Sequence, residues 1–95
     1  MDIYPDFHGP HADGHQPDAE AIAWQHPAPR SHSVRIVRRT CDCREEIYEF
    51  CAGGGLAWIR TTDRSPSAPV VRESHPSPYG DALELWRKIM NGAAR

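Results

Sequence analysis

Two cysteines separated by one residue are the feature of this sequence with the clearest capacity for chemistry. Cys41 and Cys43 flank Asp42 in the segment TCDCREE. Two thiolates at this spacing can bind a soft metal ion, but a tetrahedral site needs four ligands. The third cysteine, Cys51, falls on a returning strand roughly 25 Å beyond Cys43, because each residue advances a strand by about 3.4 Å. One metal site therefore cannot use all three cysteines.

The sequence favours a structural interpretation of these thiols. Cys51 is interpreted as a small buried apolar side chain, and Cys41 and Cys43 as residues of a turn. A thiol switch or intermolecular disulfide, and a metal site, stay open as alternatives. Arg39 and Arg44 support the switch, because cationic neighbours lower the pKa of a thiol.

A second group of possible metal ligands lies near the N-terminus. Three histidines and three aspartates lie there: His8, His11, His15, Asp6, Asp13 and Asp18. Imidazole and carboxylate groups bind zinc, nickel or copper. Gly9-Pro10 and Gly14, however, oppose the helix that would align the histidines. The sequence favours a solvated polar tail and predicts no bound cofactor.

No catalytic residue is predicted. A Ser-His-Asp grouping cannot be assembled around His75, which lies in a loop before Pro76. The run Gly53-Gly54-Gly55 lacks the Lys-Ser/Thr and the following helix that a phosphate-binding loop needs. We therefore expect a protein without enzymatic activity.

The candidate cysteines lie on or between four short segments that are rich in β-branched and aromatic residues. The predicted strands span 34–40, 45–52, 56–62 and 69–74, the last at an edge because proline is tolerated there. Turns are predicted near Asp42-Cys43 and within Gly53-Gly54-Gly55, where glycine adopts positive φ at low cost. Connections this short force antiparallel neighbours.

The register of the second and third strands stays open. A two-residue loop at Gly53-Gly54 pairs Tyr48 with Ile59 and Phe50 with Ala57. One face then carries Val37, Tyr48, Phe50, Ala57 and Ile59, and the other carries Val34, Ile36, Ile47, Cys51, Leu56 and Trp58. A loop of all three glycines pairs Phe50 with Trp58 instead, and a slip of one residue turns a whole strand over.

A C-terminal helix is predicted over residues 81–90, with a possible start at Ser77-Pro78. Its apolar stripe at helical spacing comprises Ala82, Leu85, Trp86 and Ile89. Gly92 is expected to end it. The predicted fold is a small α+β domain, an antiparallel three- to four-stranded β-meander with one C-terminal helix and an irregular N-terminal arm.

One helix covers only one face of such a sheet, and the other face keeps apolar residues. Exposed patches of this kind mark interfaces. We therefore expect a homodimer, or a complex with another protein, through Leu56, Trp58 and Arg60, with Trp58 near the centre.

Arginines interleaved with aromatic residues raise a second binding hypothesis. The residues concerned are Arg35, Arg38, Arg39, Arg44 and Arg60, with Tyr48, Phe50 and Trp58. Such surfaces stack and neutralise single-stranded nucleic acid. Cross-strand pairing of Arg39 with Glu46 would quench the charge, so nucleic acid is possible but not favoured.

Composition divides the chain of 95 residues into a Pro/His-rich arm, predicted to be flexible, over 1–32 and one domain over 33–95. A net charge of −2 provides no general attraction to nucleic acid. The absence of a long apolar run or a signal-like start predicts no membrane partner. Three cysteines are an odd number, which favours a reducing, cytoplasmic location.

Residues 45–95 resemble a group of small actinobacterial proteins of uncharacterised function. The matching residues are Tyr48-Glu49-Phe50-Cys51, Gly54-Gly55-Leu56, Ile59-Arg60-Thr61-Thr62, Leu85-Trp86 and Gly92-Ala93-Ala94-Arg95. Thr61 stands where the group has arginine. The resemblance implies a shared fold and no known activity. The sequence thus favours a small protein-interaction or regulatory module. The alternatives are a metal- or redox-responsive accessory protein and a nucleic-acid-binding regulator.

Overall fold

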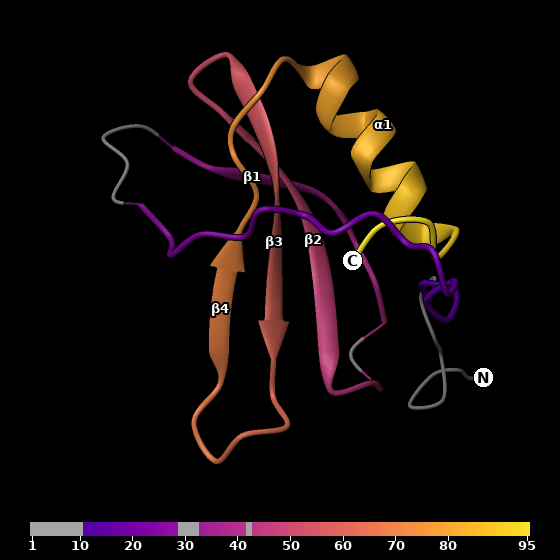
Figure 1. Cartoon of the computed structure of the whole chain (residues 1–95). Helices are drawn as coiled ribbons and strands as arrows, with labels where there is room; N and C mark the ends of the chain where they lie inside the picture. The colour runs from indigo at the N-terminus through magenta and orange to yellow at the C-terminus, as the bar shows by residue number, and fades with distance from the viewer. Residues whose placement is uncertain (1–10, 29–32, 42) are drawn as a thin grey trace, which may run out of the picture.

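The computed structural model describes residues 11–28, 33–41 and 43–95 (Figure 1). Four strands form one antiparallel sheet in chain order: β1 (Arg35–Arg39), β2 (Glu46–Gly53), β3 (Leu56–Asp63) and β4 (Val70–Glu73). Helix α1 (Tyr79–Met90) follows. This confirms the predicted α+β meander with one C-terminal helix, and the sheet has four strands.

The hairpin between β2 and β3 uses Gly54 and Gly55 as its loop, with φ of 60° and 80°. Gly53 pairs with Leu56, and Phe50 pairs with Ile59. Both predicted registers are therefore wrong. The observed loop lies one residue further along the chain than the predicted two-residue loop, which shifts the pairing by two. An even shift keeps every side chain of both strands on the face expected for it.

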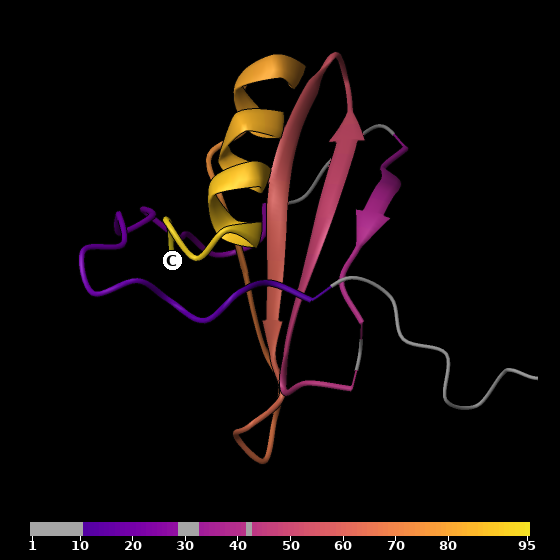
Figure 2. The same ribbon diagram turned by 90° about the vertical axis from the view of Figure 1, so that its right-hand side faces the viewer.

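Helix α1 packs on the face of the sheet that carries Phe50 and Ile59, as Figure 2 shows edge-on. The Trp86 ring meets Phe50 edge to face, with ring centroids 6.0 Å apart. The core cluster comprises Tyr48, Phe50, Ala52, Ala57, Ile59, Ala82, Trp86, Ile89 and Ala94. Ala82, Trp86 and Ile89 of the predicted stripe are buried, and Leu85 is half-buried. Gly92 follows the end of the helix with a φ of 75°.

The arm lies beside α1 on the same face of the sheet (Figures 1 and 2). Ala12, Ile22 and Trp24 pack against the core cluster. The arm also runs along the C-terminal segment, where the Ile22 amide donates to the Arg95 carbonyl at 2.7 Å. No helix forms over the described residues 11–28. The division of the chain at residue 32 and the flexibility of the arm both stay predictions.

We expected Trp58 to lie exposed at the centre of the face that α1 does not cover. This is wrong, because Trp58 is only 1% exposed. Its indole Nε1 donates to the Glu73 carboxylate at 3.1 Å. The arm pairs with β4 at this same residue, through Gln25 and Glu73. The Ala28 amide then donates to the other Glu73 carboxylate oxygen at 3.4 Å. The arm thus reaches both faces of the sheet.

In the part of the chain that the structure describes, no helical segment combines the length and apolarity required to cross a bilayer.

Candidate metal centre

The turn between β1 and β2 carries both candidate cysteines and is anchored at each end. The Thr40 amide donates to the Tyr48 carbonyl, and the Thr40 hydroxyl accepts from the Tyr48 amide, both at 2.9 Å. At the other end, the Arg64 guanidinium donates to the Arg44 carbonyl at 2.6 Å. The sheet therefore fixes the backbone on both sides of the turn.

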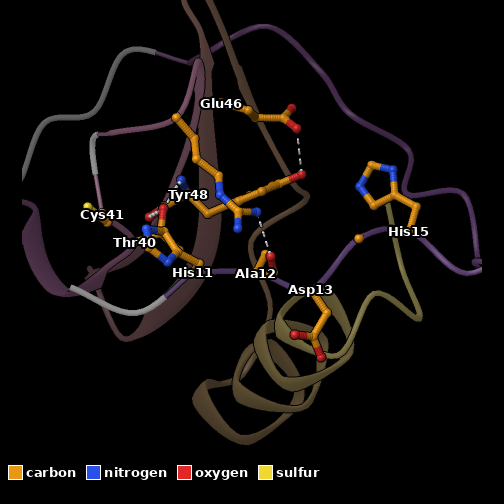
Figure 3. A pocket seen from close by; sticks show the side chains of 10 residues that line it. His11, Ala12, Asp13, His15, Thr40, Cys41, Glu46 and Tyr48 are labelled. Atoms are coloured by element: carbon orange, nitrogen blue, oxygen red, sulfur yellow. Dashed lines mark hydrogen bonds between the residues drawn. The ribbon is translucent and has the colours of Figure 1, made fainter. Parts of the chain in front are cut away.

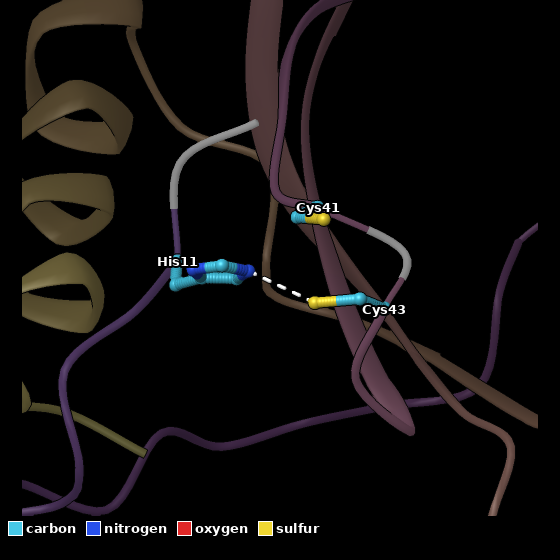
Figure 4. Close-up of side chains that lie close together, drawn as sticks. All are labelled: His11, Cys41 and Cys43. Carbon is cyan, nitrogen blue, oxygen red and sulfur yellow. Dashed lines mark hydrogen bonds between the residues drawn. The ribbon is translucent and has the colours of Figure 1, made fainter. Parts of the chain in front are cut away.

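The arm brings a histidine to this turn. His11 lies 32 positions before Cys43 in the chain, yet its Nε2 is 3.0 Å from the Cys43 Sγ. The neighbouring Ala12 carbonyl accepts a hydrogen bond from the Arg44 guanidinium at 2.9 Å. Figure 4 shows the imidazole facing Cys43, with Cys41 alongside. One arm segment and one turn thus converge on a single point.

His11, Cys41 and Cys43 each offer one ligand atom, and the three atoms lie within 4.8 Å of one another. Bonds of about 2.3 Å to sulfur and 2.0 Å to nitrogen place the ligand atoms of a tetrahedral zinc site roughly 3.5–3.8 Å apart. The observed separations, 3.0 Å between His11 Nε2 and Cys43 Sγ and at most 4.8 Å within the cluster, lie within about 1 Å of these values. Cys41 is buried, His11 is half-buried and Cys43 is exposed.

The pKa of the Cys43 thiol is raised, first because this thiol hydrogen-bonds to Cys41 and then because neighbouring atoms exclude water. The Arg44 cation acts in the opposite direction, as the sequence suggested, but its effect is smaller. A thiol that holds its proton is a poor nucleophile. A metal ion, by contrast, displaces thiol protons when it binds.

A cavity of about 280 Å³ opens beside His11 and Cys41 (Figure 3). Its lining comprises His11, Ala12, Asp13, Gly14, His15, Thr40, Cys41, Arg44, Glu46 and Tyr48. Within the lining, the Tyr48 hydroxyl donates to the Glu46 carboxylate at 2.9 Å. The cavity thus carries both signs of charge at the edge of the candidate centre.

The structure brings together residues that the sequence placed in two separate groups. His11 came from the predicted histidine tract and Cys41 and Cys43 from the predicted turn. His15 lines the cavity without belonging to the three-residue cluster, and His8 lies outside the described residues. No sequence pattern links His11 to the cysteines, because only the folded path of the arm makes that contact.

Cys51 does not take part, in agreement with the sequence argument. It is fully buried on β2, where it lies opposite Ile36 on one side and Trp58 on the other.

The residues predicted for an interface differ in exposure. Leu56 is 43% exposed and Trp58 is buried. Arg60 forms ion pairs with Glu49 at 3.7 Å and with Glu73 at 3.4 Å. The expectation that Trp58 is exposed is therefore wrong, and the interface and the homodimer stay predictions.

Arg39 forms a cross-strand ion pair on the sheet, as expected, but with a different glutamate. Arg39 lies 3.7 Å from Glu49 rather than pairing with Glu46, which binds the hydroxyls of Tyr48 and Thr61. Trp58 is also buried, so its ring is not available on this surface for stacking against a base.

No model of a known protein family matches this chain, and no curated protein or solved structure is detectably similar to it.

Proposed function

We propose that this protein is a small metal-responsive regulatory module without catalytic activity. The observation that supports the proposal is the convergence of His11, Cys41 and Cys43 within 4.8 Å. Thiolate and imidazole together favour zinc or copper(I) over magnesium or calcium. The interaction hypothesis has less support, because the aromatic residue expected at its centre is buried.

The response to the metal comes from the position of its ligands. One ligand belongs to the arm and two belong to the sheet, so a bound ion fastens the arm across the β1–β2 turn. The arm contributes Ile22 and Trp24 to the core. Because the ion binds the folded chain and closes a loop of about 30 residues, it stabilises the packed arm.

Cobalt(II) titration followed by absorbance tests the proposal. Tetrahedral cobalt bound by thiolate gives an intense charge-transfer band in the near ultraviolet, and we expect it at one equivalent of metal. The variants His11→Ala, Cys41→Ser and Cys43→Ser should each weaken binding at least about tenfold, since each removes one of three protein ligands.

Matched controls separate this site from adventitious binding. His75→Ala removes an exposed histidine elsewhere, and Cys51→Ala removes the buried cysteine of β2. Both should bind cobalt as the wild type does. Equal binding by His11→Ala and the wild type, or no thiolate band at all, would disprove the proposed function.

A further inference from the structure

We propose that a metal ion held by His11, Cys41 and Cys43 keeps one exchangeable coordination position, which opens into the adjoining cavity and binds a small carboxylate. This inference rests on the metal-binding function proposed above. It adds to that function a ligand class and a residue, Arg44, that recognises the ligand.

The number of ligands supports an open position. Zinc and its analogues take four ligands, and sites with three protein ligands hold an exchangeable fourth. Among the described residues, the cluster that can hold an ion contains only His11, Cys41 and Cys43. Asp13 and His15 line the cavity without belonging to that cluster. In Figure 3 their side chains extend from the arm apart from His11 and Cys41.

The cavity gives the fourth ligand its place and its size. His11 and Cys41 form part of its wall, so an ion between them lies at its rim. A volume of about 280 Å³ holds roughly nine water-sized groups at about 30 Å³ each. A small organic acid fits this space.

The charges in the cavity favour a carboxylate. Two thiolates neutralise a divalent ion, so the ion itself adds no net charge. Arg44 then supplies a cation, and its guanidinium has five N–H donors, one of which binds the Ala12 carbonyl at 2.9 Å. Within the described residues, Arg44 forms no ion pair. A carboxylate can therefore bind the ion with one oxygen and accept from Arg44 with the other.

Glu46, one of the two acids that line the cavity with Asp13, already has partners. Glu46 accepts hydrogen bonds from the Tyr48 hydroxyl at 2.9 Å and from the Thr61 hydroxyl at 3.2 Å. These bonds hold its carboxylate against β2 and β3 and offset part of its charge. Glu46 therefore repels an incoming anion less than an unpaired carboxylate would.

The test uses the cobalt-loaded full-length chain with acetate as the carboxylate and imidazole as a neutral donor. Acetate should change the visible cobalt bands in a saturable way. Arg44→Gln should weaken acetate binding roughly tenfold, the cost of one charge-assisted hydrogen bond, and leave imidazole binding unchanged. Arg44→Lys should recover part of the affinity, and Arg87→Gln, on the exposed side of α1, should match the wild type.

Failure of this inference differs from failure of the proposed function. A thiolate–cobalt band that acetate leaves unchanged would show that the protein fills the fourth position, and the appearance of a response in His15→Ala would identify His15 as the ligand that fills it. Equal acetate affinities of Arg44→Gln and the wild type would remove the role of Arg44. A chain that forms no such band overturns both proposals together.

Discussion

At the scale of single residues, Gly92 joins the end of α1 to the arm. Its φ of 75° is left-handed, and a Cβ at this position would collide with the Gly14 carbonyl of the arm. A left-handed backbone costs a residue with a side chain about 1–2 kcal/mol. We predict that Gly92→Ala loses more than about 2 kcal/mol of unfolding free energy, measured by urea denaturation.

Gly80 is the matched control for this substitution. It lies in the first turn of α1, where an added Cβ meets no atom within 4 Å. Gly80→Ala should be neutral or stabilise by roughly 0.5–1 kcal/mol. Similar losses in the two variants would contradict both the left-handed backbone at Gly92 and the close approach of the arm to it.

Tyr48 makes the stability of the protein depend on alkaline pH. Burial, and then the Glu46 carboxylate that accepts its hydroxyl hydrogen bond, raise the pKa of Tyr48 above its ordinary value of 10.0. The stabilisation is therefore complete below pH 10.0 and is lost as the pH rises towards the higher pKa of the folded state. We predict that unfolding free energy falls above this pH in the wild type and falls less steeply in Tyr48→Phe. Urea titrations at several pH values measure this, and parallel curves would contradict it.

At the scale of elements, α1 depends on Trp86. This side chain is buried and meets the Phe50 ring edge to face. Trp86→Ala should lower the unfolding free energy by about 3–5 kcal/mol. Leu85→Ala, on the half-buried flank of the same helix, should lower it much less. Thermal melts followed by circular dichroism measure both. A Leu85 variant that is the less stable of the two would mean that the helix packs with another face.

The arm should behave as part of the sheet layer in solution. The amides of Glu20, Ile22 and Gln25 donate to backbone carbonyls of the C-terminal segment and β4. We predict that they exchange with deuterium more slowly than the exposed Ala21 and Ala23 that alternate with them. Exchange measured by NMR distinguishes this from a flexible arm, in which all five amides would exchange alike.

Local sequence patterns predicted the strands well, but they did not predict contacts between segments far apart in the chain. The predicted strand ends agree with the structure to within about one residue, because β-branched runs between turn residues are local signals. The hairpin register was not predictable, since Gly53, Gly54 and Gly55 tolerate positive φ equally well. The contact of His11 with Cys43 depends on the path of the whole arm, which no local spacing encodes.

At the scale of the whole molecule, metal should stabilise the fold. A ligand present at about 100 times its dissociation constant adds about 2.7 kcal/mol, which corresponds to roughly 10–20 °C in a domain of this size. We predict a zinc-dependent rise of this order in the melting temperature, reversed by a chelator. The rise should be absent in His11→Ala and retained in His75→Ala. An unchanged melting temperature in the wild type would contradict the proposal that a metal ion joins the arm to the β1–β2 turn.

The pairing of Gln25 with Glu73 also bears on aggregation. Each of these two residues donates its amide to the carbonyl of the other, at 2.9 and 2.8 Å, along the outer edge of β4. An edge strand without such cover presents amides and carbonyls on which a foreign strand can add, the first step towards a fibril. The arm therefore covers this edge of the sheet at Gln25 and Glu73. Truncations or proteolytic cuts that detach it create a template for self-assembly even where the rest of the core stays folded.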